Sequence, residues 1–214
     1  MKIAVLGTGE VGHTLATRLA GLGHQVTMGS RSADNPAAKE WAAANAAAHG
    51  TFADAAADAE LVVNATGGLV SLAALTAAGA ENLRGKVVVD VSNPLDFSEG
   101  FPPKIATPDG VSVAEQLQRA FPEARVVKTL NTMNNAVMVA PGRVPGHHNV
   151  FLSGDDADAK STVSELLQSF GWAADQIIDL GDVTSARATE QLTGLWVRLY
   201  GVLGTGDFNF GIVR

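Results

Sequence analysis

A glycine-rich turn near the start of the chain has the spacing of a dinucleotide-binding fingerprint. Its three glycines follow the pattern Gly-x-Gly-x-x-Gly, directly after an apolar run and before a segment with helical spacing. In such a turn the first glycine permits a tight bend, the second lets the backbone approach a pyrophosphate, and the third lets the helix pack closely on the strand. The helix N-terminus adds free N–H groups and a positive dipole end. We therefore predict that phosphates bind at Gly7, Thr8, Gly9, Glu10, Val11 and Gly12.

The next strand-like segment ends in residues that discriminate between two dinucleotides. It closes on Gly29, Ser30 and Arg31, and the first acidic residue after it is Asp34. A protein that binds NAD usually places a carboxylate about 20 residues beyond the fingerprint, for the ribose 2′-hydroxyl. A carboxylate would repel a 2′-phosphate, whereas Arg31 can form a bidentate ion pair with it and Ser30 can donate a hydrogen bond. The sequence therefore predicts NADP(H), with Lys39 as a weaker additional contact.

Small and amide residues end three later strand-like runs. The carboxyl ends of parallel strands open on a common crevice, where ligands bind. Asn and Thr side chains there suit hydrogen bonds to ribose hydroxyls or to the nicotinamide amide, although they also cap the segments that follow strands. We assign to the cofactor site Asn64, Ala65, Thr66, Gly67, Ser92, Asn93, Pro94, Asn131 and Thr132.

The elements that must position these residues alternate between strand and helix. Short apolar runs predict strands at residues 3–6, 25–29, 60–65, 86–91, 126–130 and 149–153, with a further apolar run at 177–180. Helical spacing or alanine-rich composition predicts helices at 10–22, 36–49, 69–79, 112–121, 156–170 and 185–204. We expect a short connection after Phe52 and a surface loop over residues 95–110.

This alternation is typical of an α/β fold with a doubly wound parallel sheet of the Rossmann type. We expect residues 1–154 to form an NADP-binding Rossmann domain. Residues 155–214 are expected to form a short strand and helix extension packed on it.

Composition excludes several classes of partner and chemistry. The net charge of −7 argues against a general binder of nucleic acid or of anionic membranes, because both need clustered Lys and Arg. The chain has no cysteine, which excludes disulfides and thiolate chemistry, and its histidines lack the spacing of a metal site. The apolar runs are too short to span a bilayer and the N-terminus does not read as a signal peptide, so we expect a cytoplasmic protein.

Two familiar classes of dehydrogenase do not fit. A short-chain dehydrogenase needs a tyrosine followed four positions later by lysine, but the single tyrosine, Tyr200, is followed there by Gly204. A hydroxyacid dehydrogenase would add a large helical domain with a catalytic lysine, for which too little chain follows residue 154.

Several segments together resemble the family of NADP oxidoreductases that depend on coenzyme F420. They are residues 1–12, the step Gly29-Ser30-Arg31, residues 127–132 and the helix that carries Trp196. The similarity covers most of the chain and is weaker from Met133 onward. In that family the positions of Thr8, Ser30 and Arg31 hold NADP. The resemblance implies a Rossmann domain with a short C-terminal extension, often dimeric, that moves a hydride between NADPH and the deazaflavin.

Such a hydride transfer needs two stacked rings, so no catalytic acid, base or nucleophile is expected. We expect the second ring above the nicotinamide, next to aromatic side chains such as Trp196 and Phe208. Aromatic residues also commonly belong to a core or an interface. A basic mouth for the phosphate and polyglutamate tail of the coenzyme would need Arg143, His147, His148, Lys128 and Arg187 to lie together. The second-substrate pocket is assigned to Met133, Asn134, Trp196 and Phe208.

Other readings stay open at this point. The acceptor could instead be a flavin, a quinone or a ferric complex, and a non-enzymatic NADP(H)-binding sensor would share the first site but lack the second. The last predicted helix carries more apolar positions than one domain face needs, which favours a homodimer. These positions are Leu192, Leu195, Trp196, Leu199 and Leu203.

Overall fold

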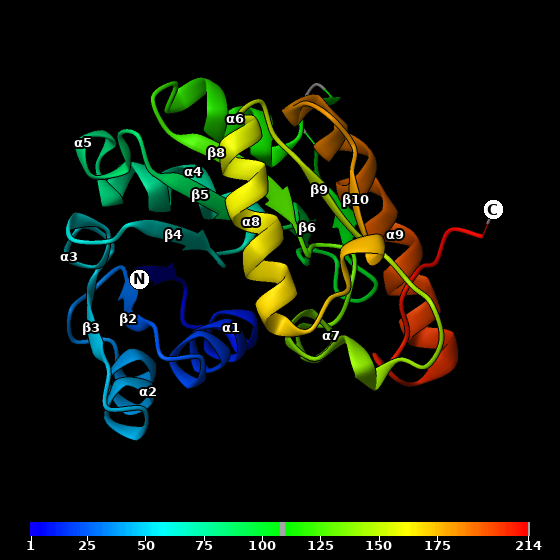
Figure 1. Cartoon of the computed structure of the whole chain (residues 1–214), viewed down its shortest axis with the longest axis horizontal. Helices are drawn as coiled ribbons and strands as arrows, with labels where there is room; N and C mark the ends of the chain where they lie inside the picture. Colours follow the sequence, from blue (N-terminus) through cyan, green and yellow to red (C-terminus); the bar gives the residue numbers. More distant parts are fainter. Residues whose placement is uncertain (108–109, 214) are drawn as a thin grey trace.

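An eight-stranded sheet forms the centre of the molecule in the computed structural model, which describes residues 1–107 and 110–213 (Figure 1). The strand order is β10-β9-β8-β5-β4-β1-β2-β3. Because β1 lies between β2 and β4, the order of the strands reverses at the carboxyl end of β1, where this type of fold binds ligands. The strands are β1 (Lys2–Leu6), β2 (Gln25–Ser30), β3 (Ala48–Thr51), β4 (Leu61–Asn64), β5 (Val87–Asp90), β8 (Arg125–Thr129), β9 (Val150–Ser153) and β10 (Ile177–Asp179).

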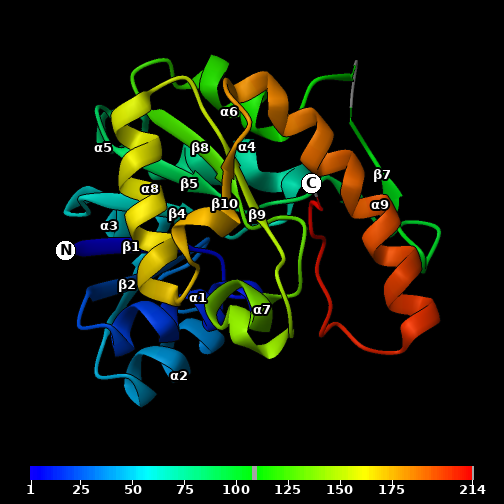
Figure 2. The ribbon, with the colours of Figure 1, turned by 45° about the vertical axis from the view of Figure 1, so that its right-hand side comes forward.

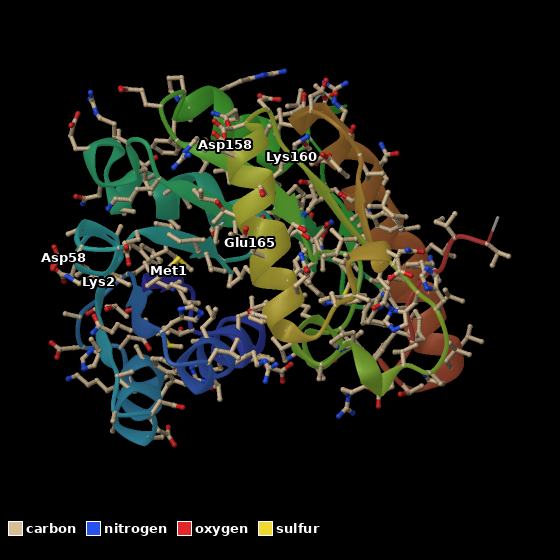
Figure 3. The ribbon with its side chains drawn as sticks, in the orientation of Figure 1. Met1, Lys2, Asp58, Asp158, Lys160 and Glu165 are labelled. Carbon is tan, nitrogen blue, oxygen red and sulfur yellow. The ribbon has the colours of Figure 1, made fainter. Side chains whose placement is uncertain are left out.

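Helices cover both faces of this sheet (Figures 1 and 2). One face packs against α1 (Glu10–Gly21), α2 (Pro36–Ala44), α7 (Asn135–Val139) and α8 (Ala157–Phe170). The other packs against α3 (Phe52–Ala57), α4 (Gly68–Ala78), α5 (Ala80–Leu83) and α6 (Val113–Ala120). The charged side chains of Asp158, Lys160 and Glu165 lie along α8, the outer helix at the front of Figure 3.

The alternation of side chains along β1 explains why both faces are covered. Ile3 and Val5 point into the first core, whereas Ala4 and Leu6 point into the second. All four are at most 1% exposed, which is the burial expected of a central parallel strand. The predicted α/β fold of the Rossmann type is confirmed.

The C-terminal helix α9 (Ala186–Leu203) and the tail after it flank the carboxyl end of the sheet. The tail folds back along the chain: Arg143 forms an ion pair with Asp207 at 2.8 Å, and the N–H of Asn149 donates to the carbonyl of Phe210 at 2.8 Å. The ring of Phe208 stacks on Trp196 of α9 with a centroid distance of 5.5 Å. The tail is therefore part of the packed structure.

Three local predictions are wrong. The helix expected over residues 36–49 ends at Ala44, because the chain turns at Ala46 (φ +50°) and residues 48–51 pair with β2 as an edge strand. The connection expected after Phe52 is helix α3, which Thr51 and Asp54 begin with a reciprocal capping box. The loop expected over 95–110 contains a small hairpin of β6 (Leu95–Asp96) and β7 (Lys104–Ile105); residues 108 and 109 lie outside the described residues.

The direction of one strand pairing in the sheet also differs from the prediction. We expected parallel strands throughout, but β9 pairs antiparallel with β8, and β10 then continues parallel to β9. Because β10 belongs to the same sheet as the nucleotide half, the division into residues 1–154 and 155–214 stays a prediction. Within the described residues no helix combines the length and apolar character needed to cross a membrane.

Candidate nucleotide-binding site

The glycine turn joins β1 to α1 at the point where the strand order reverses. Gly7 has φ +123°, a conformation that side chains disfavour, and a Cβ on it would lie 2.5 Å from the carbonyl oxygen of Ala65. A Cβ on Gly12 would lie 2.1 Å from the carbonyl oxygen of Gly7, so helix and turn are in direct contact. A Cβ on Gly9 would meet no atom within 4 Å. Gly7 and Gly12 are thus required by the fold, whereas Gly9 borders open space at the helix N-terminus.

A cleft of about 550 Å³ opens beside this turn. Arg31 is exposed and lines it, and within the described residues it forms no ion pair with a carboxylate. Asp34, the first acid after Arg31, is paired with Lys39 at 2.6 Å, and Lys39 does not line the cleft. The first cleft is lined by Gly7, Thr8, Gly9, Ser30, Arg31, Asn35, Phe52, Ala65, Thr66, Gly67, Val70, Ala73, Ala74 and Ala77.

The hydroxyl of Ser30 is already engaged within its own turn. It is 4% exposed at the residue level and donates to the carbonyl oxygen of Ser32 at 2.6 Å. Ser30 therefore presents oxygen lone pairs to the cleft in this conformation, and a hydrogen bond from Ser30 to a phosphate would require its hydroxyl to rotate.

A second cleft, of about 450 Å³, adjoins the first. The two share the lining residues Gly9, Ala65, Thr66 and Gly67, which places them end to end across the ends of β1 and β4. The remaining wall of the second cleft combines sulfur, aromatic and amide side chains. It consists of Glu10, Val11, Val91, Ser92, Asn93, Leu95, Phe97, Asn131, Met133, Asn134, Asn135, Met138, Thr193, Trp196 and Val197.

Most residues of the predicted second-substrate pocket lie on this wall. Met133, Asn134 and Trp196 line the second cleft, whereas Phe208 stacks behind Trp196 and is not part of the lining. Phe97, on the β6–β7 hairpin, also lines this cleft, and no sequence pattern pointed to it.

The polar floor of the second cleft is a set of mutual hydrogen bonds. Asn93 Nδ2 donates to the carbonyl oxygen of Asn131 at 2.6 Å, and Asn131 Nδ2 donates back to Asn93 Oδ1 at 2.9 Å. Thr193 Oγ1 on α9 also donates to Asn93 Oδ1 at 2.9 Å. Pro94 and Thr132, assigned to the site from sequence, do not line either cleft.

Beneath this floor lies a buried charge cluster that consists of Lys128, Asp90 and Glu190. Lys128 Nζ lies 2.9 Å from Asp90 Oδ2 and 2.8 Å from Glu190 Oε1, and it also donates to the carbonyl oxygen of Ser92. All three charged side chains are fully buried. Asn64 is buried as well: its Nδ2 donates to Asp90 Oδ1 at 2.8 Å, so it supports the floor and does not line either cleft.

Burial and charge act on this cluster in opposite directions. Burial alone would lower the pKa of the Lys128 ammonium, but the carboxylates of Asp90 and Glu190 outweigh it and raise this pKa. Burial raises the pKa of the Glu190 carboxyl, and the nearby Asp90 adds to that effect. Lys128 therefore stays protonated, and its charge is fully used inside the protein.

The five residues that a basic mouth would need do not line either cleft. Lys128 is buried, Arg187 is bound to Glu115 through Nε at 2.7 Å, and Arg143 is paired with Asp207. His148 is 4% exposed and its Nε2 lies 3.1 Å from the carbonyl oxygen of Pro141. These four side chains are therefore engaged by partners within the fold, whereas His147 is exposed.

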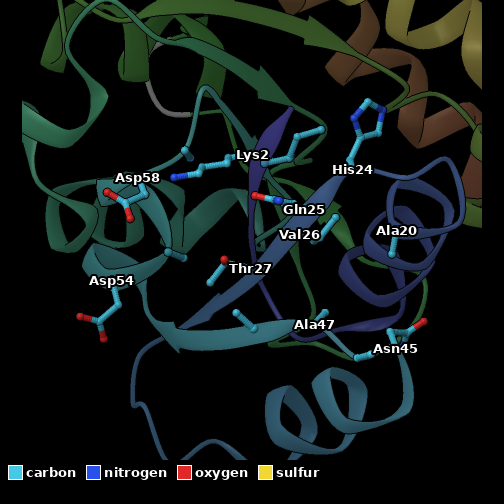
Figure 4. A pocket seen from close by; sticks show the side chains of 15 residues that line it. Lys2, Ala20, His24, Gln25, Val26, Thr27, Asn45, Ala47, Asp54 and Asp58 are labelled. Atoms are coloured by element: carbon cyan, nitrogen blue, oxygen red, sulfur yellow. The ribbon is translucent and has the colours of Figure 1, made fainter.

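Another hollow, of about 490 Å³, lies at the amino ends of β1, β2 and β3 (Figure 4). Lys2, His24, Asp54 and Asp58 lie around it. It is at the opposite end of these strands from the glycine turn, so it is not part of the candidate site. Within the described residues no group of His, Asp and Glu is arranged to hold a metal ion.

Comparison with known proteins agrees with this geometry. Residues 2–94 match the family model described as NADP oxidoreductase, coenzyme F420-dependent. The F420-dependent NADP reductase of Methanocaldococcus jannaschii is 32% identical over 222 residues, which cover 96% of this chain and 96% of that protein. A crystal structure of an assigned F420-dependent NADP reductase from Arthrobacter sp. FB24 is 56% identical, with a TM-score of 0.94 and full coverage of both chains.

A third relative is much longer than this chain. Metalloreductase STEAP3 of Rattus norvegicus is 32% identical over 191 residues, which cover 89% of this chain but only 36% of that protein. The full-length coverage of the methanogen reductase, together with the nucleotide fold, decides the family. The chain is an NADP-dependent oxidoreductase and belongs to the family of coenzyme F420-dependent NADP oxidoreductases.

Proposed function

We propose that this protein transfers a hydride between NADP(H) and a deazaflavin of the coenzyme F420 type. The observation that carries the proposal is the junction of the two clefts at Gly9, Ala65, Thr66 and Gly67. One cleft has features that suit a phosphorylated adenosine and the other suits flat rings, so a dinucleotide that spans the junction would bring its nicotinamide to the second cleft. The names of the two reductase relatives support the same pair of substrates.

The residues present fit NADP(H). The N–H groups at the start of α1 face open space at Gly9, where a pyrophosphate can approach the backbone. Arg31 would hold the 2′-phosphate, because its guanidinium lacks a carboxylate partner among the described residues. Phe52, Ala73 and Ala77 would give the adenine an apolar wall.

The second cleft suits a large planar acceptor. Met133, Met138 and Phe97 provide an apolar and polarizable surface on which rings can stack, and Trp196, already stacked with Tyr200 and Phe208, completes the wall. When bound, NADPH supplies a hydride, and reduction of the deazaflavin takes up one further proton from solvent. The protein has to orient two rings and exclude water between them, and general acid or base catalysis is not needed.

The test is to mix the protein with NADPH and one acceptor at a time, and to follow the loss of NADPH absorbance. The acceptors are an oxidised deazaflavin, FAD, FMN and a ferric chelate. We expect the highest kcat/KM with the deazaflavin. Turnover with flavin or ferric chelate but not with the deazaflavin would contradict the proposed acceptor. Tight NADPH binding without turnover on any acceptor would favour a sensor.

A matched pair of variants tests the second cleft itself. Phe97 and Phe101 lie on the same hairpin and are 57% and 64% exposed, but only Phe97 lines the cleft. Phe97→Ala should raise the KM for the deazaflavin by about fivefold or more, the loss expected when one aromatic contact is removed. Phe101→Ala should leave this KM unchanged, and equal effects of both variants would argue against this binding surface.

A ferric or flavin acceptor is the second candidate, because the similarity to a metalloreductase covers 89% of this chain. Only 36% of that relative is matched, so most of its length lies outside the comparison. The acceptor test described above decides whether this chain shares its activity.

A further inference from the structure

One face of helix α9 contacts the buried charge cluster, the polar floor and the wall of the second cleft. Glu190, Thr193 and Trp196 are spaced three residues apart, so they lie on one side of the helix. Glu190 is fully buried in the charge cluster, Thr193 is 4% exposed at the floor, and Trp196 lines the second cleft. A shift of α9 would therefore move floor and wall together.

Thr193 acts on the cleft through the amide of Asn93. Its hydroxyl lies 2.9 Å from Asn93 Oδ1, and the carbonyl oxygens of Asn131 and Thr189 are more distant at 3.4 Å. The carbonyl oxygen of Asn131 can only accept, so the Asn93 atom 2.6 Å from it is the amide nitrogen. The Asn93 oxygen then faces two donors, Thr193 Oγ1 and Asn131 Nδ2, which together fix the orientation of this amide.

The ion pair of Lys128 and Glu190 holds helix α9 where Thr193 can reach Asn93. Besides Lys128, the Glu190 carboxylate accepts the backbone N–H of Val113 at 3.0 Å, at the first turn of α6. Glu190 thus ties α9 to β8 and to α6 at once. These bonds are inside the protein, where a broken ion pair is costly, so α9 has one favoured position against the strand ends.

We propose that Thr193 is a positioning residue for the dinucleotide: anchored by Lys128 and Glu190, it holds the Asn93 amide in place for the nicotinamide end. This inference rests on the proposed NADP(H) site and adds the residue that orders its reactive end. Asn93 Nδ2 uses one of its two hydrogens on Asn131, which leaves the other for a carboxamide oxygen in the cleft.

The test compares binding of two ligands by calorimetry: NADPH, and adenosine 2′,5′-bisphosphate, which lacks the nicotinamide half. Thr193→Val removes the hydroxyl with little change in shape and should weaken NADPH binding about fivefold, the value of one ordinary hydrogen bond. Affinity for the bisphosphate should stay within about 1.5-fold, because Arg31 and the glycine turn are untouched. Thr193→Ser, which restores the hydroxyl, should recover NADPH affinity.

Thr189→Val is the matched control. Thr189 lies one turn earlier on α9 and is 5% exposed, but among residues 1–107 and 110–213 its hydroxyl donates only to the carbonyl oxygen of Ala186 in its own helix. Thr189→Val should change the thermal stability about as little as Thr193→Val does, and it should keep the wild-type affinity for both ligands. If Thr193→Val does not fold, Thr193→Ala is measured in its place.

The outcomes separate the two proposals. Thr193 variants that bind NADPH as tightly as Thr189→Val, in a protein whose wild type binds both ligands, would overturn the positioning role alone. Equal weakening of NADPH and bisphosphate would also overturn it, because the defect would then not be local to the nicotinamide end. A wild type that binds neither ligand would refute the proposed function itself.

Discussion

Replacing Gly9 with alanine should weaken NADPH binding strongly and leave the fold intact. A Cβ at this position meets no atom within 4 Å, and the backbone angles of φ −83° and ψ −179° are open to alanine. Alanine as the N-cap residue costs about 0.5–1 kcal/mol relative to glycine, and the loss of backbone freedom in the unfolded chain offsets about the same amount. The melting temperature should therefore change by less than about 2 °C.

The effect on the ligand should be much larger. A methyl group in the open space at Gly9 would keep a pyrophosphate away from the N–H groups of the first turn of α1. One charge-assisted hydrogen bond contributes about 1.5–3 kcal/mol, so losing a single one raises the Kd of NADPH by about tenfold to 100-fold. Calorimetric titration and thermal unfolding without ligand measure the two quantities separately.

Gly12→Ala is the matched comparison within the same turn. Its Cβ would lie 2.1 Å from the Gly7 carbonyl oxygen, so α1 must shift, and overpacking of this kind costs about 1–3 kcal/mol. The melting temperature should fall by about 2–12 °C. A Gly9→Ala variant that binds NADPH like the wild type, or that loses as much thermal stability as Gly12→Ala, would refute the role assigned to Gly9.

Two more predictions concern charge. Arg31→Glu should raise the Kd of NADPH by at least about tenfold, because the new carboxylate repels the 2′-phosphate. NADH binding should improve relative to NADPH binding. Equal affinity of the wild type for NADPH and NADH would contradict the role of Arg31. The hydrogen bond from Arg187 lowers the pKa of Glu115 to about 2. A lowered pKa stabilises the fold above the unfolded value of 4.5, and this stability is lost as the pH falls from there towards about 2. We expect a loss of about 2 kcal/mol or less, discounted because Arg187 is 46% exposed. Urea unfolding at about pH 5 and about pH 3 should show a smaller pH effect for Glu115→Gln than for the wild type, and an identical effect would remove Glu115 from the explanation.

The nucleotide half could be predicted from sequence because its signals are local. The glycine turn, the Gly29-Ser30-Arg31 step and the amide residues Asn64 and Asn93 each lie at the end of an apolar strand or within a few residues of it. Parallel strands then bring these ends to one edge without further information. The predicted contacts of individual residues with the cofactor stay predictions.

The remaining parts depend on contacts between distant segments. An alanine-rich sequence favours helix, yet residues 48–51 form β3 because the edge of β2 offers them backbone partners. The sequence offers Lys128 as a candidate for a basic mouth, and only the fold reveals that Asp90 and Glu190 enclose it. Thr193 lies 100 positions from Asn93, and a single sequence contains no sign of that hydrogen bond.

The docked tail has a practical consequence for work with this protein. Asp207 and Phe208 hold the tail against Arg143 and Trp196, close to the wall of the second cleft, whereas Met1 is half exposed at the amino end of β1. An affinity tag or a solid support joined at the C-terminus would pull on the segment that backs the acceptor wall. Attachment at the N-terminus leaves this segment free to pack and is the better choice for kinetics, immobilisation or fusion to a recycling enzyme.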